Sequence, residues 1–265
     1  MREARSREVW HGELLMLGLW SPWKRASQRP AELPPGLRVY AVGDIHGRAD
    51  LLLSLHTRIG EDAGTAPELE KRIVLLGDYV DRGPSSREVI EILTSEPRNG
   101  IPVTCLLGNH EAMLLQFLDD AAVGPEWMAY GGRETLMSYG VNPVSESLTE
   151  GALQVVQDDF RSKLPTSHRE FMSGLQRQMS CGDYFFVHAG VRPGIPLDRQ
   201  SETDLIWIRE EFLDSDAFHG KIIVHGHSYK HAPEVMPNRI GIDTGAYATG
   251  QLTCLVLEGQ TRRFL

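Results

Sequence analysis

From residue 37 onward, short apolar runs alternate with longer amphipathic stretches, and this alternation limits the possible folds more than any other feature of the chain. Strands are predicted at residues 37–42, 72–76 and 101–107, and helices at 50–59, 85–93 and 110–117. Strands separated by single helices predict βαβ units and a largely parallel sheet. Ser85, with Glu88 three residues later, also predicts a capping box at the start of the second helix. The chain is therefore expected to belong to the α/β class.

The rest of the chain divides into an insertion and a second set of strands. Residues 119–180 carry clustered glycines and aromatic residues, and we expect a helical, cap-like insertion beside the functional site. Strand patterns return at residues 184–187, 222–224, 239–242 and 252–257. We therefore place the main domain at residues 37–260.

Residues 1–36 are expected to be an N-terminal extension that packs on this domain. Its apolar stretch, residues 12–20, is far too short to span a bilayer. It also lacks the small-residue cleavage site of a signal peptide. These features, with no longer apolar run elsewhere, favour a cytoplasmic protein that does not contact the membrane.

The charge balance narrows the range of partners. The formal net charge is -9, so the chain lacks the broad positive field that supports nucleic-acid binding. A phosphate-binding site in such a chain would carry its positive charge as metal ions and a few arginines. The three cysteines form no C-x-x-C pair, which argues against a disulfide framework and suits a reducing compartment.

Polar residues follow the predicted strands at the point where each strand ends. Asp44, Asp78 and Asn109 come just after the first three strands. Ligands of open α/β sheets bind at the carboxyl ends of the strands, so these three side chains are expected to meet in space.

Five short motifs contain these residues and others of the same chemical type. They are GDIHG at 43–47, GDYVDRG at 77–83, GNHE at 108–111, HAG at 188–190 and HGH at 225–227. Aspartate, histidine and asparagine are ligands for divalent cations such as Mn, Fe or Zn. The absence of a thiolate among them argues against a structural zinc site. Taken together, the motifs predict a metal site of catalytic type.

In this order, the five motifs resemble those of the phosphoprotein phosphatases within the calcineurin-like metallophosphoesterases, and most closely those of the compact bacterial and phage members. The resemblance spans roughly residues 39–257. It implies a sandwich of two mixed β-sheets flanked by helices.

The resemblance also implies two divalent ions, with Mn²⁺ expected and Fe or Zn as alternatives. The first ion would be held by Asp44, His46 and Asp78. The second would be held by Asp78, Asn109, His188 and His227. Asp78 would bridge ions about 3.5–4 Å apart, and a water between them would ionise near neutral pH and attack phosphorus in line. Whether His225 is also a ligand stays open.

Other residues receive roles from the same resemblance. His110 would be the general acid that protonates the leaving group, and Asp81 would orient its imidazole. Arg82 and Arg209 would bind the phosphoryl oxygens, together with Asn109. Glu111 is expected to support the site structurally.

These features make a Ser/Thr protein phosphatase the leading hypothesis, favoured by GNHE and by the adjacent Asp81 and Arg82. The alternative is a symmetrical bis(5'-nucleosyl)-tetraphosphatase, a group in which the position of Asp81 typically holds a small residue and that of Glu111 an aspartate. A more distant alternative is an inactive scaffold that binds phosphorylated partners. The expected substrate is accordingly a phosphoprotein or a phosphorylated small molecule, and the oligomeric state stays open.

Overall fold

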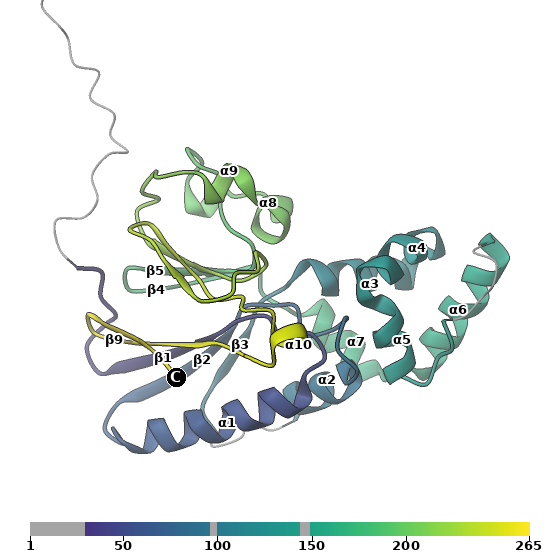
Figure 1. Ribbon diagram of the computed structural model, residues 1–265, viewed down its shortest axis with the longest axis horizontal. Helices are drawn as coiled ribbons and strands as arrows, with labels where there is room; N and C mark the ends of the chain where they lie inside the picture. Colours follow the sequence, from purple (N-terminus) through teal and green to yellow (C-terminus); the bar gives the residue numbers. More distant parts are fainter. Residues whose placement is uncertain (1–29, 96–99, 144–148) are drawn as a thin grey trace, which may run out of the picture.

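The computed structural model describes residues 30–95, 100–143 and 149–265, and it contains two five-stranded sheets stacked face to face (Figure 1). Residues 1–29 of the predicted N-terminal extension lie outside the described residues. Its last residues contact the domain, since Leu33 is buried and donates its backbone N–H to the carbonyl of Gly259 at 2.9 Å.

The first sheet has the strand order β10-β9-β1-β2-β3. Its strands are β1 (Leu37–Val42), β2 (Glu70–Leu75), β3 (Val103–Cys105), β9 (Cys254–Glu258) and β10 (Thr261–Phe264). Strands β1, β2 and β3 are parallel, as the alternation of strands and helices predicted. Strand β9 runs antiparallel to β1, and β10 continues the sheet beyond residue 260.

The second sheet has the order β4-β5-β6-β8-β7. Its strands are β4 (Gln178–Cys181), β5 (Tyr184–Val187), β6 (Ile222–His225), β7 (Glu234–Val235) and β8 (Arg239–Gly241). Strands β5, β6 and β8 are parallel, and an antiparallel strand borders them on each side. Both sheets are thus mixed, and the predicted fold class is confirmed.

Alternation along the strands builds two separate cores. On β1, Val39 and Ala41 point into the layer between the sheets, where they pack with Phe186 and Val224 of the second sheet. Tyr40 and Val42 point to the opposite face and join the core under the helices. Because successive side chains of a strand point to opposite faces, one buried strand serves both layers.

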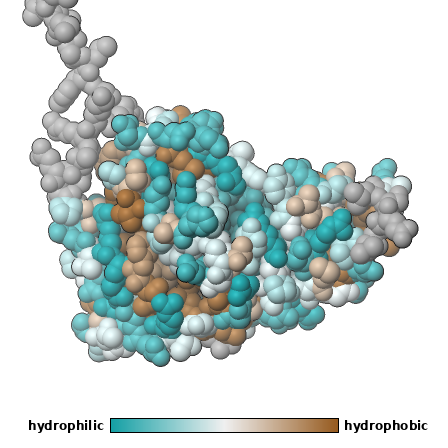
Figure 2. All heavy atoms as spheres, viewed as in Figure 1, coloured by the Kyte–Doolittle hydropathy of each residue, from teal (hydrophilic) through white to brown (hydrophobic). Residues whose placement is uncertain are grey.

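Helices cover the outer faces of the stacked sheets (Figure 1). Helices α1 (Ala49–Gly64) and α2 (Ser86–Thr94) lie along the first sheet, and α8 (Glu202–Trp207) and α9 (Glu210–Leu213) lie over the second. The short helices η5 (Leu197–Arg199) and α10 (Ala246–Thr249) belong to connecting loops. Figure 2 shows that apolar side chains on this face gather over the sheets and α1.

A helical lobe projects from one end of the sheets (Figure 1). It contains α3 (Asn109–Asp119), η3 (Ala121–Val123), α4 (Gly124–Trp127), the π-helical turn η4 (Met128–Gly132), α5 (Arg133–Ser138), α6 (Glu150–Lys163) and α7 (Thr166–Ser173). The described residues of the predicted insertion are thus mainly helical, with β4 at its end. We call this part the helical lobe.

One local prediction is wrong. Ser85 is the N-cap of α2, but its side chain makes no capping hydrogen bond, so the predicted capping box does not form. Its backbone is tied elsewhere, because its N–H donates to the carbonyl of Gly47 at 3.0 Å. The start of α2 is therefore held by the loop after β1.

Candidate metal centre and active site

The candidate site lies where strands of both sheets end. The turns after β1 and β2 are tied together, because the N–H groups of Ile45 and His46 both donate to the carbonyl of Asp78, at 3.0 and 2.8 Å. In the second sheet, Gly226 donates its N–H to the carbonyl of His188 at 2.8 Å. These bonds fix the turns that carry the predicted ligands.

The backbone of these turns is strained. Among the described residues, five that are not glycine have positive φ angles, and they are His46, Asp78, Asp81, Arg82 and His227. Side chains in this conformation are sterically unfavourable, and such strain gathers at functional sites. All five belong to the set of residues predicted from the motifs.

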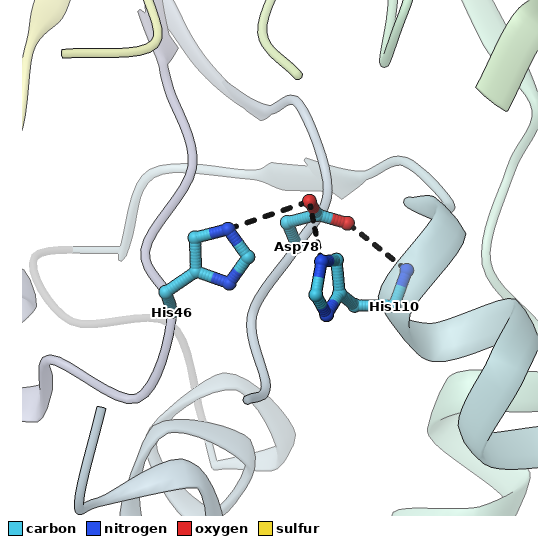
Figure 3. Close-up of side chains that lie close together, drawn as sticks. All are labelled: His46, Asp78 and His110. Carbon is cyan, nitrogen blue, oxygen red and sulfur yellow. Dashed lines mark hydrogen bonds and ion pairs between the residues drawn. The ribbon is translucent and has the colours of Figure 1, made fainter. Parts of the chain in front are cut away.

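Asp78 stands at the centre of the site. Two groups of side chains in the described part of the chain could each hold a metal ion, and both contain Asp78. The first group adds His46 and His110, drawn in Figure 3, and the second adds His188 and His227. One carboxylate shared by two groups is the arrangement that a bridging ligand requires.

In the first group, His46 directs one ring nitrogen at Asp78. Its Nδ1 lies 2.9 Å from the carbonyl of Val80, so Nδ1 carries the proton and Nε2 is available as a ligand. That Nε2 lies 3.5 Å from Oδ2 of Asp78 and 2.8 Å from a guanidinium nitrogen of Arg82.

Asp44, the remaining residue predicted for the first ion, is buried on the side of His227. Its carboxylate accepts the backbone N–H of His227 at 3.0 and 3.2 Å. This hydrogen bond joins Asp44, predicted for the first ion, to His227, predicted for the second.

Asn109 joins the second group, and four ligand atoms then lie close together. Oδ1 of Asn109 lies 3.0 Å from Nε2 of His188 and 2.9 Å from Nδ1 of His227. Oδ1 of Asp78 lies 3.3 Å from the same His188 nitrogen. Ligands about 2.0–2.2 Å from one cation are about 3–3.5 Å apart, which matches this spacing. His188 bonds its other ring nitrogen to the carbonyl of Leu76 at 2.9 Å, which fixes the tautomer.

The protonation states also suit divalent cations. Burial lowers the pKa of His46 to about 3 and that of His227 to about 2, so both imidazoles are neutral. Burial and the charges of Asp243 and Asp78 raise the pKa of Asp44 well above its usual range. Buried carboxylates that repel one another are stabilised by a bound cation. Among the described residues, the buried Nε2 of His227 has no hydrogen-bond partner. A buried polar atom beside the cluster is therefore left without a polar contact.

The predicted acid pair is well formed. Nδ1 of His110 lies 2.7 Å from Oδ2 of Asp81, and both residues are buried. The pKa of His110 is raised, because the charges of Asp78 and Asp81 outweigh the opposing effect of burial. A histidine in this environment retains its proton and can donate it.

The two predicted phosphate-binding arginines lie near different residues of the cluster. The guanidinium of Arg82 is 5.2 Å from the ring centre of Tyr247 and next to His46. Arg209 is exposed at the start of α9. Burial lowers the pKa of His188, and the positive charge of Arg209 also lowers it. Both are cations at the edge of the candidate site.

His225, whose role stayed open, belongs to neither group in the described residues. Its Nδ1 lies 3.0 Å from the carbonyl of Gly226, and its ring packs against Phe212 at 5.1 Å. Its side chain lies between β6 and α9.

Sequence reasoning missed two contributions to the site. Asp243 is buried just after β8, where burial and the charge of Asp78 raise its pKa to about 6. An aspartate directly after a predicted strand was the signal that could have revealed it. Trp127 and Thr135 of the helical lobe both donate hydrogen bonds to Asp81, and no local pattern indicated these contacts.

Residues 37–250 match the family model described as calcineurin-like phosphoesterase. The chain therefore belongs to the calcineurin-like phosphoesterases and is a metallophosphoesterase.

Two relatives are named for different activities. The chain is 26% identical over 226 residues to serine/threonine-protein phosphatase 2 of Salmonella typhimurium, covering 81% of this chain and 90% of that protein. It is also 26% identical over 233 residues to bis(5'-nucleosyl)-tetraphosphatase PrpE [asymmetrical] of Bacillus mycoides, covering 81% and 88%. A crystal structure of a proposed diadenosine tetraphosphatase superposes with a TM-score of 0.59 at 22% identity, covering 89% of this chain and 97% of that chain. That structural likeness supports the fold.

Within the described residues, no helix is both long enough and apolar enough to cross a membrane.

Proposed function

We propose that this metallophosphoesterase is a phosphomonoesterase that removes phosphate from serine and threonine side chains of proteins. When bound, two divalent cations would supply an ionised water and neutralise charge on the phosphoryl group. The first would be held by Asp44, His46 and Asp78. The second would be held by Asp78, Asn109, His188 and His227.

The hydrogen bond between His110 and Asp81 is the observation that carries this proposal. A serine alkoxide is a very poor leaving group, so its departure requires a proton from a general acid. A nucleotide phosphate leaves without such help, since it is stable as an anion. The buried Asp81 carboxylate orients the His110 ring so that Nε2 faces the cluster, 3.8 Å from Asp78. His110 would therefore deliver its proton where the leaving oxygen departs.

The arginines complete the proposed site. Arg82 and Arg209 would bind the non-bridging phosphoryl oxygens, and Arg82 can do so through its planar fork. Asn109 lies between His188 and His227 and would contact both a cation and the phosphate. We further propose Mn²⁺ as the native ion and the cytoplasm as the location.

A second candidate activity is the hydrolysis of bis(5'-nucleosyl)-tetraphosphates, favoured by the activity for which the Bacillus mycoides relative is named. The motifs leave the symmetrical class as the alternative, whereas that relative is named asymmetrical. The two classes differ in which phosphoanhydride bond they cleave. The products of diadenosine tetraphosphate would distinguish them.

The test combines a substrate series with the variant His110→Asn. Kinetic parameters would be measured with Mn²⁺ for a phosphoserine peptide, 4-nitrophenyl phosphate and diadenosine tetraphosphate. We expect His110→Asn to reduce kcat on the phosphoserine peptide by roughly 10²–10⁴-fold. The loss on 4-nitrophenyl phosphate should be much smaller, because nitrophenolate leaves without a proton, and metal content should not change.

Two outcomes would reject the proposal. A preference of the wild-type enzyme for the dinucleotide by about a hundredfold in kcat/KM would make the tetraphosphatase the main activity. Metal binding without turnover of any of the three substrates would instead support the inactive scaffold.

A further inference from the structure

We propose that Trp127 and Thr135 are positioning residues through which the helical lobe holds Asp81 against His110. This inference rests on the proposed function, because it assigns a role in proton donation to the leaving group. The helical lobe would then support proton donation through Asp81 as well as border the site.

Asp81 has a defined hydrogen-bond partner on each carboxylate oxygen. Oδ1 accepts the hydroxyl proton of Thr135 at 2.6 Å, and Oδ2 accepts the indole N–H of Trp127 at 2.9 Å. The same Oδ2 lies 2.7 Å from Nδ1 of His110. A carboxylate held at both oxygens cannot rotate about its terminal bond without breaking a hydrogen bond to a charged group. Its plane, and with it the direction of the His110 ring, is therefore fixed.

Thr135 also holds the backbone of Asp81. The N–H of Asp81 donates to the hydroxyl oxygens of Thr135 at 2.9 Å and Ser86 at 3.0 Å. Asp81 has a φ angle of 71°, a conformation that is unfavourable for a residue with a side chain. The hydroxyl of Thr135 thus stabilises both the strained backbone and the carboxylate of one residue.

Trp127 is held rigidly by the aromatic core of the lobe. It is fully buried, and its ring centre lies 4.9 Å from that of Phe117 and 5.9 Å from that of Phe160. A Cβ atom at Gly132 would lie 2.5 Å from the indole, so only glycine allows the π-helical turn η4 to pack there. The indole N–H consequently points at Asp81 from a fixed place.

The decisive variants remove a single donor and keep most of the volume. Trp127→Phe removes the indole N–H, and Thr135→Val removes the hydroxyl with little change of shape. Thr135→Ser keeps the hydroxyl and serves as the conservative rescue. Tyr139→Phe is the control, because it removes a buried hydrogen bond of the lobe, to His168, that does not involve Asp81.

We expect a loss that depends on the leaving group. Trp127→Phe and Thr135→Val should reduce kcat on a phosphoserine peptide by about tenfold or more, since each loses a hydrogen bond to a charged group. On 4-nitrophenyl phosphate the loss should stay below about twofold, because proton donation contributes little there. Thr135→Ser should recover most of the loss, and Tyr139→Phe should affect both substrates equally.

A double-variant cycle tests whether the residues act through Asp81. In an Asp81→Asn background, Trp127→Phe should cause almost no further leaving-group-dependent loss, because the two changes would disable the same step. Fully multiplicative effects would refute the inference. So would equal losses on both substrates in Trp127→Phe, with thermal stability lowered as in Tyr139→Phe. Failure of the wild-type enzyme on the phosphoserine peptide would instead reject the proposed function, which keeps the two failures distinct.

Discussion

The carboxylate of Glu111 accepts the backbone N–H of Asp78 at 2.9 Å. It accepts three further backbone N–H groups, from Tyr79, Val80 and Gly108. The first turn of α3, which carries Asn109 and His110, is thereby joined to the turn that presents Asp78. A single buried side chain holds two of the loops that form the candidate metal centre.

Glu111→Gln should weaken the site without removing a ligand. Its amide nitrogen would face backbone N–H donors, leaving at least one of them without an acceptor at a cost of about 1–3 kcal/mol. Burial and the charge of Asp78 raise the pKa of Glu111 to about 8, while the backbone donors favour its anion. We expect a lower unfolding midpoint in urea and weaker Mn²⁺ binding by calorimetry. The exposed Glu126→Gln is the control, and equal Mn²⁺ affinity in both variants would contradict this role.

Asp78 should be needed for both ions and His188 for one. Asp78→Asn is therefore expected to lose both ions, whereas His188→Ala should retain one, since only the second group contains it. Metal per protein after dialysis against Mn²⁺ would be measured by plasma mass spectrometry. His231→Ala, an exposed histidine, should bind like wild type. One ion retained by Asp78→Asn would rule out the bridging role.

Gly131→Ala should disturb Arg82, which we propose to bind phosphate. Gly131 has a φ angle of 112°, and a Cβ there would lie 2.7 Å from the backbone nitrogen of Arg82. Gly140 has a φ angle of 74° with open space around it, so Gly140→Ala carries the backbone strain alone. We expect KM for 4-nitrophenyl phosphate and Ki for inorganic phosphate to rise several-fold only in Gly131→Ala, which displaces one phosphate contact worth about 1–3 kcal/mol. Equal changes in both variants would show that strain alone matters.

Asp62 should contribute stability that depends on pH. It accepts hydrogen bonds from Arg38 at 2.9 Å, Tyr40 at 2.8 Å and Arg263 at 2.5 Å, and so joins α1 to the first sheet. Burial alone would raise its pKa, but Tyr40 and the arginines lower it below the ordinary value. A lowered pKa in the folded state stabilises the protein above the unfolded value of about 3.9, and this stability is lost as pH falls through the folded value.

Asp62→Asn should therefore lower the free energy of unfolding by about 1–2 kcal/mol at pH 7. The difference from wild type should shrink below about pH 4. Urea unfolding at several pH values measures it, with Asp216→Asn as the exposed control. A difference that stayed constant down to pH 3 would refute the electrostatic explanation.

The parallel order of β1, β2 and β3 could be predicted because each strand is an apolar run that ends at a Gly-Asp or Gly-Asn pair. The convergence of Asp78, Asn109 and His188 followed from those strand ends and from the motifs. Such features are local in sequence, and the geometry of a parallel sheet converts them into proximity.

Contacts that depend on the packing of distant elements could not be predicted. The indole of Trp127 reaches Asp81 only because the lobe folds back over the turn after β2. Strand β10 has only four residues, TRRF, and they carry too little pattern to reveal a strand. The failed capping box at Ser85 has the same origin, since the loop after β1 takes the place of the local hydrogen bond.

Among the described residues, the five non-glycine residues with positive φ angles place thermal stability in conflict with activity. Glycine adopts this conformation without a steric penalty, so glycine at any of them would relieve about 1 kcal/mol or more of strain. The same exchange would delete a side chain that the proposed chemistry uses. Selection for thermal stability alone would therefore favour glycine at positions whose side chains are proposed to be required for turnover.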